Sequence, residues 1–107
     1  MRLYHNPRCS KSRLAVKLLT EHGVQFEEYR YLDLGISLDD IDLLSNLDGV
    51  IRVNDVKDKS KIPNNVEGIR QLLQNEPQVL QRPILISNGV AVIGRPPEDI
   101  LTLLRVA

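Results

Sequence analysis

The only cysteine of the chain, Cys9, is surrounded in the sequence by residues that favour its reactive form. Three basic residues and two serines lie close to it: Arg8, Lys11, Arg13, Ser10 and Ser12. Nearby cations lower the pKa of a thiol, and the thiolate is the nucleophile. The serine hydroxyls can donate hydrogen bonds to the sulfur or to a bound anion. We therefore predict that Cys9 is a thiolate nucleophile that acts on an oxyanion or a disulfide. The alternative, a cysteine that only packs in the core, does not suit so polar a segment.

The residue three positions after Cys9 limits how an oxidised sulfur can be restored. The spacing is C-x-x-S, with Ser12 where a dithiol oxidoreductase carries its resolving cysteine. Because the chain has one cysteine, an outside thiol such as glutathione must complete any redox cycle. A cysteine-rich zinc site needs several clustered ligands, and the two histidines, His5 and His22, are too few for a histidine-rich one. We expect no metal.

Length and charge exclude several classes of protein. The 107 residues suffice for one domain, and 14 basic residues balance 14 acidic ones. A nucleic-acid-binding protein usually carries a basic surplus, so we expect no nucleic-acid partner. No apolar run approaches the roughly 20 residues that span a bilayer, and the first residues lack the apolar region of a signal peptide. We expect a cytoplasmic protein without membrane contact, in a compartment that keeps thiols reduced.

The elements around Cys9 must place it at a helix start. Residues 2–5 are expected to form a strand, residues 10–22 a helix that ends at Gly23, and residues 26–31 a second strand. This order is typical of a parallel βαβ unit. Cys9 would then lie at the N-terminus of the helix, where free N–H groups and the helix dipole stabilise an anion.

The last part of the chain predicts a hairpin and a helix. The apolar runs 83–87 and 90–94 flank Asn88-Gly89, and Asn-Gly between apolar runs is the strongest short hairpin signal. A helix is expected over residues 97–105, with proline in its first turn.

The intervening residues, about 33–81, predict a helical insert. One helix should begin with Ser37 as its N-cap and another should span residues 66–75, with short helix and loop over residues 49–65. The apolar stripe of the first helix would consist of Leu38, Ile41, Leu44 and Leu47. The element order β-α-β, helices, β-β-α predicts a single α/β domain, residues 1–107, with a thioredoxin-like fold and a mixed four-stranded sheet.

Three motifs resemble a known family. Residues 4–13, YHNPRCSKSR, are similar to the active-site signature of the glutaredoxin-linked arsenate reductase (ArsC) family. Residues 81–84, QRPI, and 94–98, GRPPE, resemble that family's two Arg-Pro motifs, before the hairpin and at the start of the last helix. The similarity is strong over residues 1–32 and 78–104.

The resemblance implies a reaction and its partners. In that family the cysteine attacks arsenate, and glutathione with glutaredoxin resolves the thiol–arsenic intermediate. Cys9 would then be the nucleophile, and arsenate or a similar oxyanion the substrate. Glutathione would be the co-substrate and glutaredoxin the protein partner. We expect a monomer with no bound cofactor.

The resemblance also implies roles for residues around the sulfur. Arg82 and Arg95 would hold the oxyanion with forked donors that are always charged, assisted by Ser10 and Ser12. His5 would hydrogen-bond near the sulfur and tune it. Pro83 would be the cis-proline beside the cysteine. Four residues next to the site are expected to support the groups that bind and attack the substrate: His5, Asn6, Arg13 and Pro83.

The insert departs from the family pattern. Those reductases carry a third arginine there, whereas here Val56 takes its place with Lys57 beside it. A lysine cannot reproduce the forked geometry of a guanidinium, so the sequence leaves two alternatives open. One is a glutathione-dependent thiol oxidoreductase without arsenate activity. The other is an Spx-type regulator that binds RNA polymerase, although Ser12 replaces the second cysteine such regulators typically have.

Overall fold

The computed structural model describes residues 1–105, which form two compact units. One unit combines residues 1–30 with the chain from residue 82 onward, and the other contains residues 31–81. The second unit corresponds to the predicted insert at about 33–81. No helix among the described residues is long and apolar enough to span a membrane.

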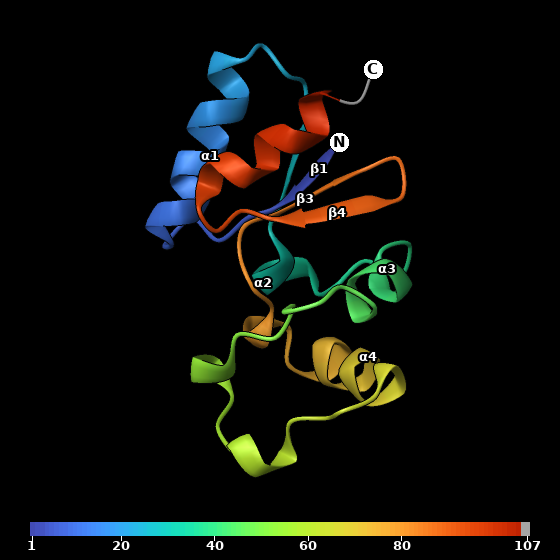
Figure 1. Ribbon diagram of the computed structural model, residues 1–107. Coiled ribbons are helices and arrows are strands. Elements are labelled where there is room, and N and C mark those ends of the chain that lie inside the picture. Colours follow the sequence, from blue (N-terminus) through green and yellow to red (C-terminus); the bar gives the residue numbers. More distant parts are fainter. Residues whose placement is uncertain (106–107) are drawn as a thin grey trace. The chain divides into compact units, whose positions relative to one another are not determined.

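A four-stranded mixed sheet forms the centre of the first unit (Figure 1). Its strands are β1 (Arg2–Tyr4), β2 (Glu27–Tyr29), β3 (Ile84–Ser87) and β4 (Val90–Ile93), in the order β2-β1-β3-β4. β1 pairs with β2 in parallel and with β3 antiparallel, and β3 pairs with β4 antiparallel. The predicted α/β fold with a mixed four-stranded sheet is therefore confirmed.

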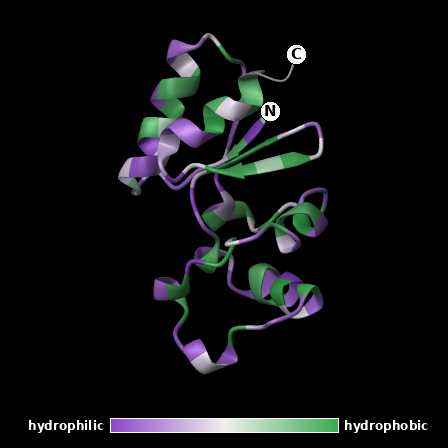
Figure 2. Ribbon diagram, viewed as in Figure 1, coloured by the Kyte–Doolittle hydropathy of each residue, from purple (hydrophilic) through white to green (hydrophobic). Residues whose placement is uncertain are grey.

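Two helices cover one face of this sheet: α1 (Ser10–Glu21) and the 3₁₀ helix η4 (Pro97–Arg105), which pack side by side (Figure 1). The apolar residues of β3 and β4 stand out in Figure 2. A fully buried core cluster joins the helices to the sheet and includes Leu3 and Leu85 of the strands and Ala15, Leu19 and Ile100 of the helices. Burial of side chains of this kind contributes roughly 1.5–3 kcal/mol each, and it fixes α1 on the sheet.

Local sequence explains where these elements begin and end. α1 stops where predicted, because Gly23 has φ +68°, a conformation that glycine adopts without steric cost. The hairpin turn has positive φ at both Asn88 and Gly89, as a two-residue type I′ turn requires. The final helix has the predicted bounds but is wound as a 3₁₀ helix, and its first bond already joins the Asp99 N–H to the carbonyl of Pro96.

The second unit is helical, with one irregular antiparallel contact between Ile51 and Leu80. Its α-helices are α2 (Tyr31–Leu34), α3 (Ile41–Ser45) and α4 (Val66–Asn75). Its 3₁₀ helices are η1 (Val53–Asp55), η2 (Lys59–Lys61) and η3 (Pro77–Val79). α4 has the predicted bounds and packs on α3, where Arg70 forms a salt bridge with Asp42.

One element of the second unit was missed, and one expectation was wrong. α2 was not predicted, and the helix expected to start at Ser37 begins only at Ile41. The Ser37 hydroxyl accepts from the Asp39 N–H and its carbonyl accepts from the Asp40 N–H, so the segment closes a turn instead. Leu38 is consequently 78% exposed rather than part of the apolar stripe.

Candidate active site

Cys9 is the N-cap residue of α1, as predicted, and is half-buried. Its backbone is extended (φ −92°, ψ 123°), and the first turn of the helix follows directly. The backbone N–H groups of Lys11 and Ser12, in that turn, lower the pKa of the Cys9 thiol, but neither forms a cap hydrogen bond with its side chain. A helix start therefore supplies to Cys9 the donors that an anion needs.

Two arginines from distant parts of the sequence also lie at the sulfur. The Arg82 side chain hydrogen-bonds to it. Arg95 Nη2 lies 4.0 Å from Cys9 Sγ, and Arg95 Nε donates to the Arg82 carbonyl oxygen at 3.0 Å. The structure thus brings together Cys9, Arg82 and Arg95, which the sequence had predicted to meet.

These donors decide the charge state of the thiol. Partial burial by itself raises the pKa of Cys9. The Ser12 N–H, the Arg82 side chain with its charge, and the Lys11 N–H together outweigh burial and hold the pKa of Cys9 below its ordinary value. A larger fraction of Cys9 is therefore thiolate at neutral pH than in a free cysteine.

Both Arg-Pro peptide bonds of the site are cis. The prediction that Pro83 follows a cis bond is confirmed, and the bond between Arg95 and Pro96 is also cis, which was not predicted. The Pro83 carbonyl accepts from the Gly94 N–H at 2.8 Å. The two Arg-Pro segments are therefore joined to each other by backbone hydrogen bonding as well as by the Arg95 side chain.

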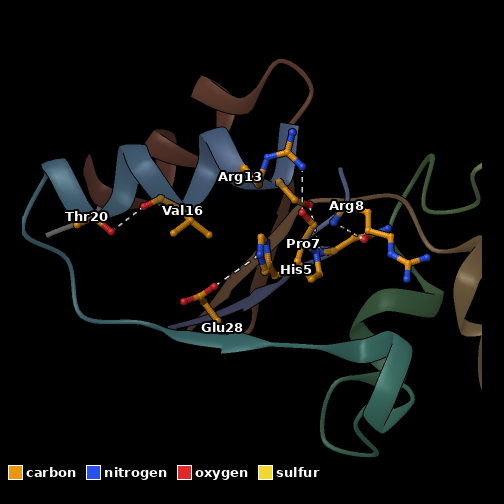
Figure 3. A network of polar contacts seen from close by, with 9 residues as sticks. His5, Pro7, Arg8, Arg13, Val16, Thr20 and Glu28 are labelled. Atoms are coloured by element: carbon orange, nitrogen blue, oxygen red, sulfur yellow. Dashed lines mark hydrogen bonds and ion pairs between the residues drawn. The ribbon is translucent and has the colours of Figure 1, made fainter. Parts of the chain in front are cut away.

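The loop before Cys9 is held by its own polar contacts. Asn6, which is buried, accepts the Cys9 N–H with its carbonyl at 2.9 Å and the Arg8 N–H with its side-chain oxygen at 3.0 Å. Arg13 donates from Nη1 to the Pro7 carbonyl at 3.0 Å (Figure 3). Asn6 and Arg13 thus shape the loop that presents the sulfur, while Arg13 itself remains exposed.

The side-chain role predicted for Ser12 is corrected. Ser12 is fully buried, and its hydroxyl accepts the Asn6 N–H at 3.3 Å. The helix turns this side chain inward, and it is the backbone N–H of Ser12 that lowers the pKa of Cys9. Ser10, at the first position of α1, is exposed.

The hydrogen bond expected from His5 toward the sulfur is not formed. The residue is buried, and its Nε2 lies 3.6 Å from Glu28 Oε1 (Figure 3), while Nδ1 has no hydrogen-bond partner within the described chain. Burial lowers the pKa of His5, the Glu28 charge opposes this, and the charges of Arg30 and Arg13 add to it. The neighbouring strand β2, and not Cys9, therefore supplies the polar partner of His5.

Besides the cis bond between Arg95 and Pro96, three features of the site were not predicted from the sequence: the Glu28 partner of His5, the hydrogen bond from Arg95 to the Arg82 carbonyl, and the buried Gly94 beside Pro83. In the sequence, only the GRPP motif at residues 94–97 could have indicated a role for Gly94. Within residues 1–105, no group of three histidine, cysteine or acidic side chains could hold a metal ion.

Comparison with known proteins identifies the family and the fold of the chain. The model of the ArsC family matches residues 4–103. The arsenate reductase of Neisseria meningitidis is 36% identical, over 97% of each chain. The solved structure of a putative arsenate reductase from Yersinia pestis is 32% identical with a TM-score of 0.80, covering 94% of this chain and 97% of its own. That of an arsenate reductase from Vibrio cholerae is 25% identical with a TM-score of 0.71, covering 95% and 97%. Because the match spans nearly all of the chain in sequence and in fold, this thioredoxin-like protein belongs to the ArsC family.

Proposed function

We propose that the protein reduces arsenate, with Cys9 as nucleophile and glutathione and glutaredoxin as reductants. The observation that carries this proposal is the convergence of Arg82, Arg95 and the α1 N-terminus on one sulfur. A tetrahedral oxyanion needs forked, permanently charged donors and free backbone N–H groups. The same groups that lower the thiol pKa would therefore hold the substrate against the nucleophile.

The chemistry follows from having one thiol. Attack by the Cys9 thiolate on arsenate would form a sulfur–arsenic(V) bond and release water. The reduction to arsenite requires two electrons, which the chain's single cysteine cannot supply alone. A glutathione thiol and a glutaredoxin thiol would provide them and be oxidised to a disulfide as arsenite leaves, returning Cys9 to its thiolate.

The test is arsenate-dependent oxidation of glutathione in the presence of glutaredoxin, coupled to glutathione reductase and NADPH. The wild type should turn over, and Cys9→Ser should not. Phosphate, a tetrahedral oxyanion that these thiols do not reduce, is the control substrate. Wild-type turnover no faster than that of Cys9→Ser would overturn the proposal.

A second function, thiol–disulfide exchange without arsenate reduction, is favoured by one observation in the second unit. Val56, at the position where the family pattern has a third arginine, is 7% exposed and belongs to the apolar interior. Arg52, nearby in the sequence, has its Nε 3.2 Å from Asp55 Oδ2. Incubation with a glutathionylated peptide tests this function, because transfer of glutathione to Cys9 without arsenate turnover would select it.

A further inference from the structure

Gly94 occupies a position in the first unit where any side chain would collide with its neighbours. It directly follows β4, precedes Arg95 and is buried. A Cβ atom there would lie 2.8 Å from Pro83 Cγ and 3.0 Å from Ile100 Cγ2. Carbon atoms in good contact are about 3.5–4.0 Å apart. Gly94 is not among the glycines with positive φ, so close approach, and not backbone conformation, is what requires glycine here.

The residues that touch Gly94 are attached to those at the sulfur. Pro83 follows Arg82, whose side chain hydrogen-bonds to Cys9 and whose carbonyl accepts from Arg95. Arg95 follows Gly94 itself. The contact between Gly94 and Pro83, closed by the 2.8 Å backbone hydrogen bond, therefore sets the spacing of the two backbone segments that carry the guanidinium groups.

We propose that Gly94 is a positioning residue of the Cys9 site: its missing side chain lets Pro83 approach closely enough for Arg82 and Arg95 to reach the sulfur together. Because the interior is close-packed, a methyl group at position 94 would push Pro83 aside and carry Arg82 with it. The proposal rests on the thiolate chemistry proposed for Cys9, but not on arsenate as the substrate.

The test is the pH profile of Cys9 alkylation by iodoacetamide in Gly94→Ala. As the arginines retreat from the sulfur, the profile should move to higher pH by about half a unit or more, with slower alkylation at neutral pH. Loss of stability alone would not move this profile.

Gly89→Ala is the matched control. Gly89 belongs to the same unit and the same hairpin, its φ is +77°, and a Cβ there meets nothing within 4 Å. Alanine at that position strains the turn without touching Pro83. The control should lose stability and keep the wild-type alkylation profile.

If Gly94→Ala does not fold, a second variant tests the proposal. Ile100→Leu removes the Cγ2 branch that a methyl at position 94 would meet, so Gly94→Ala/Ile100→Leu has more room and is compared with Ile100→Leu alone. A shifted profile relative to that reference supports the proposal. An unchanged profile in the folded variant, whether single or double, overturns it. Absence of arsenate turnover in the wild type would count against the proposed function and leave the alkylation result standing.

Discussion

Arg95 holds the Arg82 backbone and faces Cys9 with the same guanidinium group: Nε donates to the Arg82 carbonyl at 3.0 Å, and Nη2 lies 4.0 Å from the sulfur. The planar guanidinium group of Arg95 thus holds the backbone at Arg82 and contributes positive charge at the Cys9 thiolate. A lysine has a single ammonium and cannot make both contacts in this fixed geometry.

Arg95→Lys should therefore raise the pKa of Cys9 and slow its alkylation at neutral pH. A hydrogen bond to a charged group contributes about 1.5–3 kcal/mol, so a loss of roughly 10- to 150-fold in rate is expected. Stopped-flow measurement of alkylation against pH gives both quantities. Arg13→Lys, at an exposed residue that contacts Pro7 and not the sulfur, should change the rate far less. Equal effects of the two substitutions would contradict the role given to Arg95.

The thiolate of wild-type Cys9 should be detectable below the pH at which a free cysteine ionises. The Ser12 N–H, the Arg82 side chain and the Lys11 N–H together outweigh the effect of burial on the pKa of Cys9. Thiolate absorbance in an ultraviolet titration, with Cys9→Ser as the blank, measures the midpoint directly. A midpoint at or above about 8.5, the free value, would exclude the depressed pKa.

Stability should fall as the pH drops below the ordinary pKa of histidine, about 6.5. Burial is the main cause of the lowered pKa of His5, so the folded protein binds a proton there less readily than the unfolded chain. The protein therefore has its full stability above the pKa that His5 has in the unfolded chain. That stability is lost as the pH falls from this value to the lower pKa of His5 in the folded protein. Urea unfolding at a series of pH values measures this.

Glu28→Gln should widen that pH window. The carboxylate 3.6 Å from His5 Nε2 supports the protonated ring, so its removal lowers the pKa of His5 further. His5→Gln, which removes the titrating group, should flatten the pH dependence. If the stability of His5→Gln depends on pH as steeply as that of the wild type, another group is responsible.

Ser12→Ala should affect folding more than reactivity. The substitution leaves the buried Asn6 N–H without its hydroxyl acceptor, a loss of about 1–3 kcal/mol. The Ser12 N–H that lowers the pKa of Cys9 belongs to the backbone and is retained. Chemical unfolding should show the loss, while the alkylation rate of Cys9 remains close to that of the wild type. Ser10→Ala, at an exposed position, serves as the stability control.

The sequence by itself determined the features that depend only on residues close together along the chain. The position of Cys9 at a helix start, the stop at Gly23 and the hairpin at Asn88-Gly89 follow from local backbone preferences, and the structure has all three. The single cysteine already required an external thiol for any redox cycle. The pairing of Arg82 and Arg95 with the sulfur was predictable only because the motifs resembled a family.

Only the tertiary structure decided how side chains far apart in the sequence share one site. The direction of the Ser12 hydroxyl, the Glu28 partner of His5 and the close contact of Gly94 with Pro83 depend on register and packing across the sheet. Local propensity carries no information on such contacts, because the packing of distant segments fixes their distances. For the same reason the helix expected at Ser37 began later, where a turn competed successfully with the helical backbone.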